Sequence, residues 1–265
     1  MGRLHAYMGS VSRPPLLLAL WLLAACCPQA GVSMRSARNA ALADQSSDRP
    51  GADAYRGRPI AVGRSSLPSG RSISDLSTSE CRRLLSRAQV RFDALPDKST
   101  PAIVDPLTLH GKMLDVEFEP ANGMAKNGIV DCRLAVALLA WAPILHDAGV
   151  VRVEHYSTFR PGAKVRKTGK MSGHAHALAI DAARFHLRDG RVIEVLEDWD
   201  ERERGGAPCP VRRSENDSGR VLRQVVCRAV ERDLFQVVIT PHHDRDHQNH
   251  VHLELVPHVD WSYIH

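Results

Sequence analysis

The feature that most constrains this chain is a concentration of histidines near its C-terminal end. The chain has 14 histidines, and five of them fall within eleven residues: His242, His243, His247, His250 and His252. Residues two apart on a β-strand face the same side, so a strand here would point His250 and His252 at one centre. The alternative is a solvated histidine-rich tract with loose metal affinity. The His-x-His spacing therefore suits a pair of site residues on a β-strand in this part of the chain.

A second group of candidate site residues lies in residues 172–181, SGHAHALAID. His174 lies on the approach to a predicted strand, and Asp181 lies within that strand. A carboxylate in an apolar strand is costly to bury unless its charge is compensated, either by a metal ion or by an arginine such as Arg160 or Arg184. The alanines of this stretch would let the backbone and a substrate come close to each other.

Taken together, the two groups supply His, Asp and His from separate strands, with no obvious fourth protein ligand. This is the pattern of a catalytic zinc site that keeps one position for water. Zinc in such a site lowers the pKa of the water to about 7 and polarises a carbonyl. The residues therefore favour a catalytic zinc centre.

The spacing of apolar residues predicts an α+β fold. Three helices are expected, over residues 79–95, 131–148 and 218–233. Strands are expected over residues 150–156, 178–187, 192–196, 235–239 and 251–256, with a hairpin turn at Asp189-Gly190. Because the helices lie before and between the strands, we expect a small, mainly antiparallel β-sheet with flanking helices. Residues 105–128 and 198–217 show no pattern and are interpreted as loops.

Four cysteines, Cys81, Cys132, Cys209 and Cys227, form an even set compatible with two disulfides in an oxidising compartment. Four cysteines allow three connectivities. The pairs Cys81–Cys132 and Cys209–Cys227 are favoured because shorter loops close at a lower entropic cost. Free buried thiols or a zinc site are the alternatives, although no C-x-x-C spacing supports a metal.

The N-terminal residues have the order of a secretory signal peptide. Two arginines precede the apolar run of residues 16–25, which is too short to span a bilayer. The run ends in LAAC, which resembles a bacterial lipobox, so residues 1–26 are expected to direct export and Cys26 to be lipidated. Ordinary cleavage at small residues is the alternative. We expect a protein of the periplasm or cell envelope, held at the membrane only through an N-terminal lipid anchor.

Residues 27–75 are rich in Ser, Arg, Gly, Pro and Ala, and they predict a disordered linker before one domain at residues 76–265. The formal net charge is +5, but residues 1–25 contribute +2 and residues 26–75 contribute +3, which leaves the predicted domain neutral. A neutral domain lacks the basic footprint of a protein that binds phosphate backbones. We therefore expect no nucleic-acid partner.

Two motifs resemble those of LAS-type zinc peptidases, the group that includes lysostaphin, D-Ala-D-Ala carboxypeptidase and the hedgehog signalling domain. The S-x-H-x-x-G-x-A-x-D motif is fitted by Ser172, His174, Ala179 and Asp181. The sequence HQNHVH at residues 247–252 fits the H-x-x-H-x-H ending of the penicillin-insensitive murein endopeptidase branch. The resemblance implies a LAS-like metallopeptidase fold.

The chain from about Cys81 to Glu254 also resembles the bacterial extensin-like C-terminal domain family. That family's pattern has a Cys-x-x-Ala helix, a short strand ending in Arg, the His-to-Asp motif, a D-W pair and a terminal H-x-x-H-x-H. Here these features fall at Cys132 to Ala135, Arg160, His174 to Asp181, Asp198-Trp199 and His247 to His252.

The resemblance implies a ligand set for Zn²⁺ consisting of His174, Asp181 and His252. His176 also has His-x-His spacing with His174, but we expect it outside the ligand set, either next to it or exposed.

The resemblance also implies roles for residues around the metal. His250, aided by His247, would transfer a proton. Arg160 matches an arginine that faces the substrate carbonyl or carboxylate in LAS enzymes, where a fixed cation would stabilise developing negative charge. A plain salt bridge is the alternative for Arg160.

Three positions depart from the family patterns. Ala177 replaces the motif glycine, so its methyl group is expected to crowd the backbone. Asn249 stands where the dipeptidase branch has a glutamate general base, which leaves His250 for that role. Phe159 stands where the extensin-like pattern often has Cys, so the family's disulfide pattern cannot be copied whole.

The function expected is zinc-dependent hydrolysis of an amide bond in peptidoglycan stem peptides, by an endopeptidase or a carboxypeptidase. The alternative is a non-catalytic, zinc-containing lipoprotein that binds peptidoglycan. A structural polyproline rod is excluded because the 16 prolines are spread through the chain without Ser-Pro-rich repeats.

Overall fold

The computed structural model describes residues 68–96, 100, 102–121, 123, 128–199, 205, 207–209 and 216–265. The predicted signal peptide, its lipidation candidate Cys26 and the predicted linker as far as residue 67 lie outside these residues. Among the described residues, no helix combines the length and the apolar character needed to cross a bilayer.

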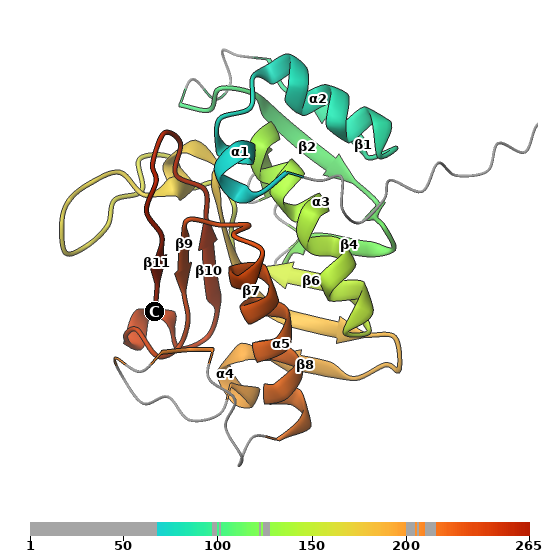
Figure 1. The fold of residues 1–265 in the computed structure, drawn as a ribbon, viewed down its shortest axis with the longest axis vertical. Helices are drawn as coiled ribbons and strands as arrows, with labels where there is room; N and C mark the ends of the chain where they lie inside the picture. Colours follow the sequence, from blue (N-terminus) through green and yellow to red (C-terminus); the bar gives the residue numbers. More distant parts are fainter. Residues whose placement is uncertain are drawn as a thin grey trace, which may run out of the picture. The chain divides into compact units, whose positions relative to one another are not determined.

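The described chain is α+β and contains two sheets (Figure 1). The smaller sheet is antiparallel, with the strand order β1 (Arg91–Ala94), β2 (Pro106–His110), β5 (Ile129–Asp131). The larger sheet has eight strands, of which seven follow the order β11 (Tyr263–Ile264), β9 (Val237–Ile239), β10 (Val251–Glu254), β7 (Ala179–Leu187), β6 (Val150–His155), β4 (Val116–Pro120), β3 (Lys112–Met113). The eighth strand, β8 (Val192–Glu194), pairs with β7. Two pairs, β4 with β6 and β9 with β11, are parallel.

The apolar helix predicted from residue 131 is α3 (Cys132–Asp147), which begins where the Asp131 side chain accepts a hydrogen bond from the Arg133 N–H. It packs beside α5 (Asp217–Glu231) in front of the larger sheet (Figure 1). Trp141 is the centre of this packing. Its ring lies 6.2 Å from each of three phenylalanine rings, and its indole N–H donates to a carbonyl of α5. The face of the larger sheet that α3 and α5 cover therefore forms the main core.

The helix predicted over residues 79–95 is shorter in the structure, and residues 88–95, nearly half of the predicted range, were wrongly assigned. Helix α2 (Thr78–Arg87) begins at a capping box between Ser77 and Glu80. It ends because Gln89 adopts the left-handed conformation, with φ 58°. Phe92 and its neighbours then form β1. The apolar spacing continued across the turn by coincidence.

Two further expectations are corrected in the same way. Residues 105–128, expected to be a loop, contain β2 of the smaller sheet and β3 and β4 of the larger one. The larger sheet is mainly antiparallel, as expected, but it is not small. The alternation Val116-Glu-Phe118-Glu in β4 was a signal for a strand. The strand expected over residues 192–196 ends at Glu194, where the short helix α4 (Val195–Asp198) begins.

The folded part begins before residue 76, the start predicted for the domain. Helix α1 (Gly70–Ser74) lies inside the predicted linker, yet Ile73 is fully buried in the main core. The Gly70 N–H donates to the Asp233 carbonyl at 2.6 Å, and a Cβ on Gly70 would lie 2.3 Å from the Leu234 oxygen. Composition alone did not predict that this segment is folded, because Ile73 is the only large apolar residue of the helix.

Both disulfides match the pairing expected from the sequence. Cys81 on α2 is bonded to Cys132 at the start of α3, and Cys209 is bonded to Cys227 on α5. The first disulfide ties α2 to the helix that covers the larger sheet.

Candidate metal centre

The fold brings together three candidate ligands that are far apart in the sequence. Strands β7 and β10 are antiparallel neighbours, and their register places Asp181 directly opposite His252. Side chains opposite each other on adjacent strands share one face, with Cβ atoms roughly 5 Å apart. His174 reaches the same point from η2 (Gly173–His176), a short 3₁₀ turn that leads into β7.

One donor atom from each ligand lies within about 3 Å of the other two. The distances are 2.9 Å from His174 Nε2 to Asp181 Oδ1, 3.0 Å from His252 Nδ1 to the same oxygen, and 3.1 Å between the two nitrogens. The centre of such a triangle lies about 1.7 Å from each corner, which is 3.0 Å divided by the square root of three. Zinc binds such donors at about 2.0–2.2 Å, so an ion can contact all three from one side of their plane. The residues therefore fit a metal ion.

The cluster is buried, so the negative charge of Asp181 needs compensation, which a bound cation would supply. The exposed fractions are 0% for His174, 3% for Asp181 and 6% for His252. Burial alone would raise the pKa of Asp181, but His174 and His252 outweigh it and hold this pKa well below its usual range. Asp181 is therefore a carboxylate, the form that ligates metals.

Hydrogen bonds with residues outside the triangle fix the orientation of two candidate ligands. The His174 ring donates from Nδ1 to the Thr158 carbonyl at 3.3 Å, which leaves Nε2 facing the cluster. The Ser157 hydroxyl donates to Asp181 Oδ2 at 3.3 Å. Such outer contacts hold metal ligands in a single orientation.

The structure places Arg160 and His250 beside Asp181. Arg160 Nη2 lies 3.6 Å from Asp181 Oδ2, and the arginine side chain is 54% exposed. His250 Nε2 lies 3.4 Å from Asp181 Oδ1. Burial lowers the pKa of His250 to about 4, so its ring is neutral near pH 7. Arg184, the other arginine considered for Asp181, pairs instead with Glu154 and Glu194.

The remaining histidines of the C-terminal segment differ in their surroundings. The His247 ring lies 5.2 Å from the ring of His250 and 6.1 Å from that of His252, so it borders the cluster. The His243 ring lies 5.7 Å from the ring of His247. His242 is buried near Trp199, at 6.1 Å between rings. The segment is therefore a structured site and not a solvated tract.

His176 takes no part in the cluster. Its Nδ1 lies 2.8 Å from the Ala102 carbonyl, to which it donates. Within the described residues, the group that could hold a metal consists of His174, Asp181 and His252. The position expected for His176, outside the ligand set, agrees with this geometry.

Ala177 shows why a glycine would suit its position. Its backbone is left-handed, with φ 53° and ψ 31°, so the requirement is conformational and the expected crowding by the methyl group is not the reason. The alanines 175, 177 and 179 are all fully buried. They therefore pack inside the protein, and the expectation that they leave room for a substrate is wrong.

Sequence reasoning missed two side chains next to the cluster. Glu254 Oε2 lies 2.9 Å from His252 Nε2. Its position two residues after His252 on a strand was a signal for a shared face. His155 is buried, and burial lowers its pKa to about 4. It lines a hollow of about 90 Å³ together with Thr158, the residue that contacts His174.

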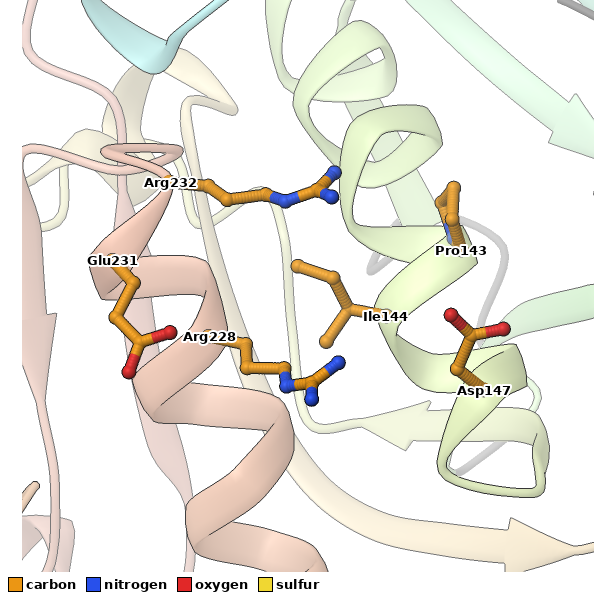
Figure 2. A pocket seen from close by; sticks show the side chains of 6 residues that line it. All are labelled: Pro143, Ile144, Asp147, Arg228, Glu231 and Arg232. Carbon is orange, nitrogen blue, oxygen red and sulfur yellow. The ribbon is translucent and has the colours of Figure 1, made fainter. Parts of the chain in front are cut away.

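A larger surface hollow, of about 260 Å³, lies between α3 and α5 (Figure 2). Figure 2 shows Arg228 and Arg232 pointing from α5 toward α3, while Glu231 points away. No member of the metal cluster lines it. Both helices end beside it, and the partial negative charge at their C-terminal ends disfavours an anion there despite the two arginines. We therefore place the functional site at the histidine cluster.

Comparison with known proteins gives one match. The model of a family described as extensin-like protein C-terminus matches residues 79–264, a range that contains the whole metal cluster. No curated protein and no solved structure matches the chain.

Proposed function

We propose, from the premise that this chain belongs to the family of extensin-like protein C-terminal domains, that it is a zinc-dependent hydrolase of amide bonds in peptidoglycan stem peptides. The observation that carries the proposal is the buried His174, Asp181 and His252 triangle with a cation and a neutral histidine at its edge. The proposal includes kinship with LAS-type peptidases and their fold, which the two sequence motifs support.

Zinc is the metal that the donor set favours. Two imidazole nitrogens and one carboxylate oxygen suit zinc better than magnesium or calcium, which prefer all-oxygen sites. Bound here, zinc would supply a polarised water and a Lewis acid for a carbonyl oxygen. With three protein ligands, one position remains for the reacting groups.

His250 is suited to accept a proton. Its Nδ1 donates to Asn249 Oδ1 at 2.8 Å, so the neutral ring has its lone pair on Nε2, the atom that faces the cluster. His247 donates from Nδ1 to Asp244 Oδ1 at 2.7 Å and borders the His250 ring. His250 would therefore take the proton, and His247 would help to keep the His250 ring in place.

Arg160 is suited to hold the oxygen that becomes negative. Its backbone N–H donates to the His174 carbonyl at 2.9 Å, which fixes the arginine to the metal-binding turn. One guanidinium nitrogen faces Asp181 at 3.6 Å, while half of the side chain is exposed to an incoming substrate. A cation held in this way stabilises charge as it develops.

The segment after Arg160 supports an anionic substrate. Residues 161–171 contain four cations and no acid. Two of these cations, Arg166 and Lys167, approach Asp246 and Asp244, which flank the histidine segment. Lys164 and Lys170 add charge at the base of the loop at residues 163–172, whose ends are joined by a hydrogen bond from the Ser172 N–H to the Ala163 carbonyl. Stem peptides with free carboxylates complement such a surface.

We further propose that the protein is exported and that Cys26 carries a lipid. Two disulfides support an oxidising compartment. Replacement of Cys26 by Ser should release the protein from the membrane fraction. Retention of the variant on membranes would remove the proposed anchor.

The test is mass spectrometry of cross-linked muropeptides after incubation with the zinc-loaded protein. Asp181→Ala should abolish any product of amide hydrolysis, because it removes a ligand. Asp93→Ala is a matched control, since this aspartate is 77% exposed and lies in the smaller sheet. Absence of product from a protein with one bound zinc would reject the enzyme. Chelator-sensitive binding to sacculi would then favour a peptidoglycan-binding lipoprotein.

A further inference from the structure

The two ring nitrogens of His252 have different partners. Nδ1 faces the ligand triangle, at 3.0 Å from Asp181 Oδ1. Nε2 lies 2.9 Å from Glu254 Oε2, on the other side of the ring. A carboxylate can only accept a hydrogen bond, so Nε2 carries a proton toward Glu254. On the other side of the ring, a metal ion would take the place of the proton on Nδ1.

The strand places the glutamate where it can make this contact. Glu254 follows His252 by two residues on β10, so both side chains lie on the same face of the larger sheet. The Glu254 side chain is 17% exposed, which keeps its hydrogen bond to His252 largely out of solvent. A carboxylate in this position holds an imidazole ligand in one orientation and raises its basicity.

The position of Gly173 provides the space for this carboxylate. A Cβ on Gly173 would lie 2.6 Å from both Cγ and Cδ of Glu254 and 2.9 Å from its Oε2. The backbone of Gly173 is not left-handed, so the position needs the missing side chain and not the conformational freedom of glycine. The same residue begins the 3₁₀ turn that carries His174.

We infer that Glu254 is a positioning residue that fixes His252 with Nδ1 toward the metal, and that Gly173 is required because it leaves room for the Glu254 carboxylate. The inference rests on the metal centre of the proposed function, but it does not depend on catalysis. It links the turn that delivers one ligand to the orientation of another ligand on a different strand.

Metal affinity of the purified full chain tests this inference. Zinc and cobalt(II) would be titrated in competition with a chromogenic chelator. Glu254→Gln, Glu254→Ala and Gly173→Ala should each weaken binding by about 10- to 100-fold. Each variant should also change the visible absorption of bound cobalt(II), which reports the ligand geometry. Gly128→Ala is the matched glycine control, since its Cβ would meet only ordinary contacts at 3.7 Å. Glu231→Gln, an exposed residue, is the control for the glutamate.

The double variant Gly173→Ala with Glu254→Ala gives the sharpest result. If Gly173 acts only by leaving room for Glu254, the double variant binds metal as well as Glu254→Ala alone. Additive losses would reject the role given to Gly173. The expected loss of metal affinity is at least about 10-fold. If Glu254→Gln and Glu254→Ala both bind metal within about threefold of the wild type, the role given to Glu254 is rejected. A wild type that binds metal but releases no muropeptide product would reject the proposed function and leave this inference standing.

Discussion

Removal of the disulfides should destabilise the protein in an order set by the length of chain that each one closes. Cys81 and Cys132 are 51 residues apart, and Cys209 and Cys227 are 18 residues apart. In the chain-entropy model these loops contribute about 4 and about 3 kcal/mol at 25 °C. For a domain of this size, 1 kcal/mol shifts the midpoint of thermal unfolding by about 2–4 °C. Loss of the first disulfide should therefore lower the midpoint by about 8–16 °C, and loss of the second by about 6–12 °C.

Alanine is the right replacement for the first pair, because Cys81 and Cys132 are buried and serine would place hydroxyl groups in the core. Urea unfolding of each double-alanine variant measures the free energy, with the slope fitted for each variant because loss of a cross-link expands the unfolded chain. Metal affinity should be retained by the folded variants, since neither disulfide touches the ligand triangle. A larger loss of free energy from the shorter loop would refute the argument from loop length.

Three other predictions concern the metal centre and the start of the domain. Zinc at 100 times its dissociation constant should raise the free energy of unfolding by about 2.7 kcal/mol, and Asp181→Asn should abolish this increase in a urea titration. His250→Ala should keep the metal and lose about 10²- to 10⁴-fold in turnover of muropeptides, whereas loss of the metal would show that this histidine is a ligand. Ile73→Ala should lower the free energy of unfolding in urea by about 2–5 kcal/mol, because the side chain is fully buried. An effect below about 1 kcal/mol would show that α1 belongs to the linker and not to the folded domain.

The three candidate ligands could be predicted from the sequence because they lie in local patterns. His174 and Asp181 share one short motif, and His252 lies in another. Their meeting depends on strand register, which two alternating strands with a buried face specify strongly. The contact between Glu254 and His252 was also local, at a spacing of two residues. The overlap of a Cβ on Gly173 with Glu254 is between the 3₁₀ turn η2 and the end of β10, which are far apart in the sequence, and no local pattern reports it.

The errors in the fold have the same physical origin. Strands β3 and β5 have two and three residues, too short for periodicity to identify. Helix α1 owes its place to the contacts of Ile73 and Gly70 with distant parts of the chain. Such elements depend on tertiary packing, which composition and spacing do not encode.

Metal binding and turnover should be separable by mutation, because different kinds of structure support them. Asp181 and His252 lie on central strands of the larger sheet, where both neighbouring strands restrain the backbone. Arg160 and His250 lie outside the strands, and their side chains face Asp181 at longer distances, 3.6 and 3.4 Å. The ligands are therefore held by the sheet, whereas the groups assigned to charge stabilisation and proton transfer have freedom to adjust to a substrate. Changes in the ligands should remove both properties, and changes in the flanking groups should remove turnover alone.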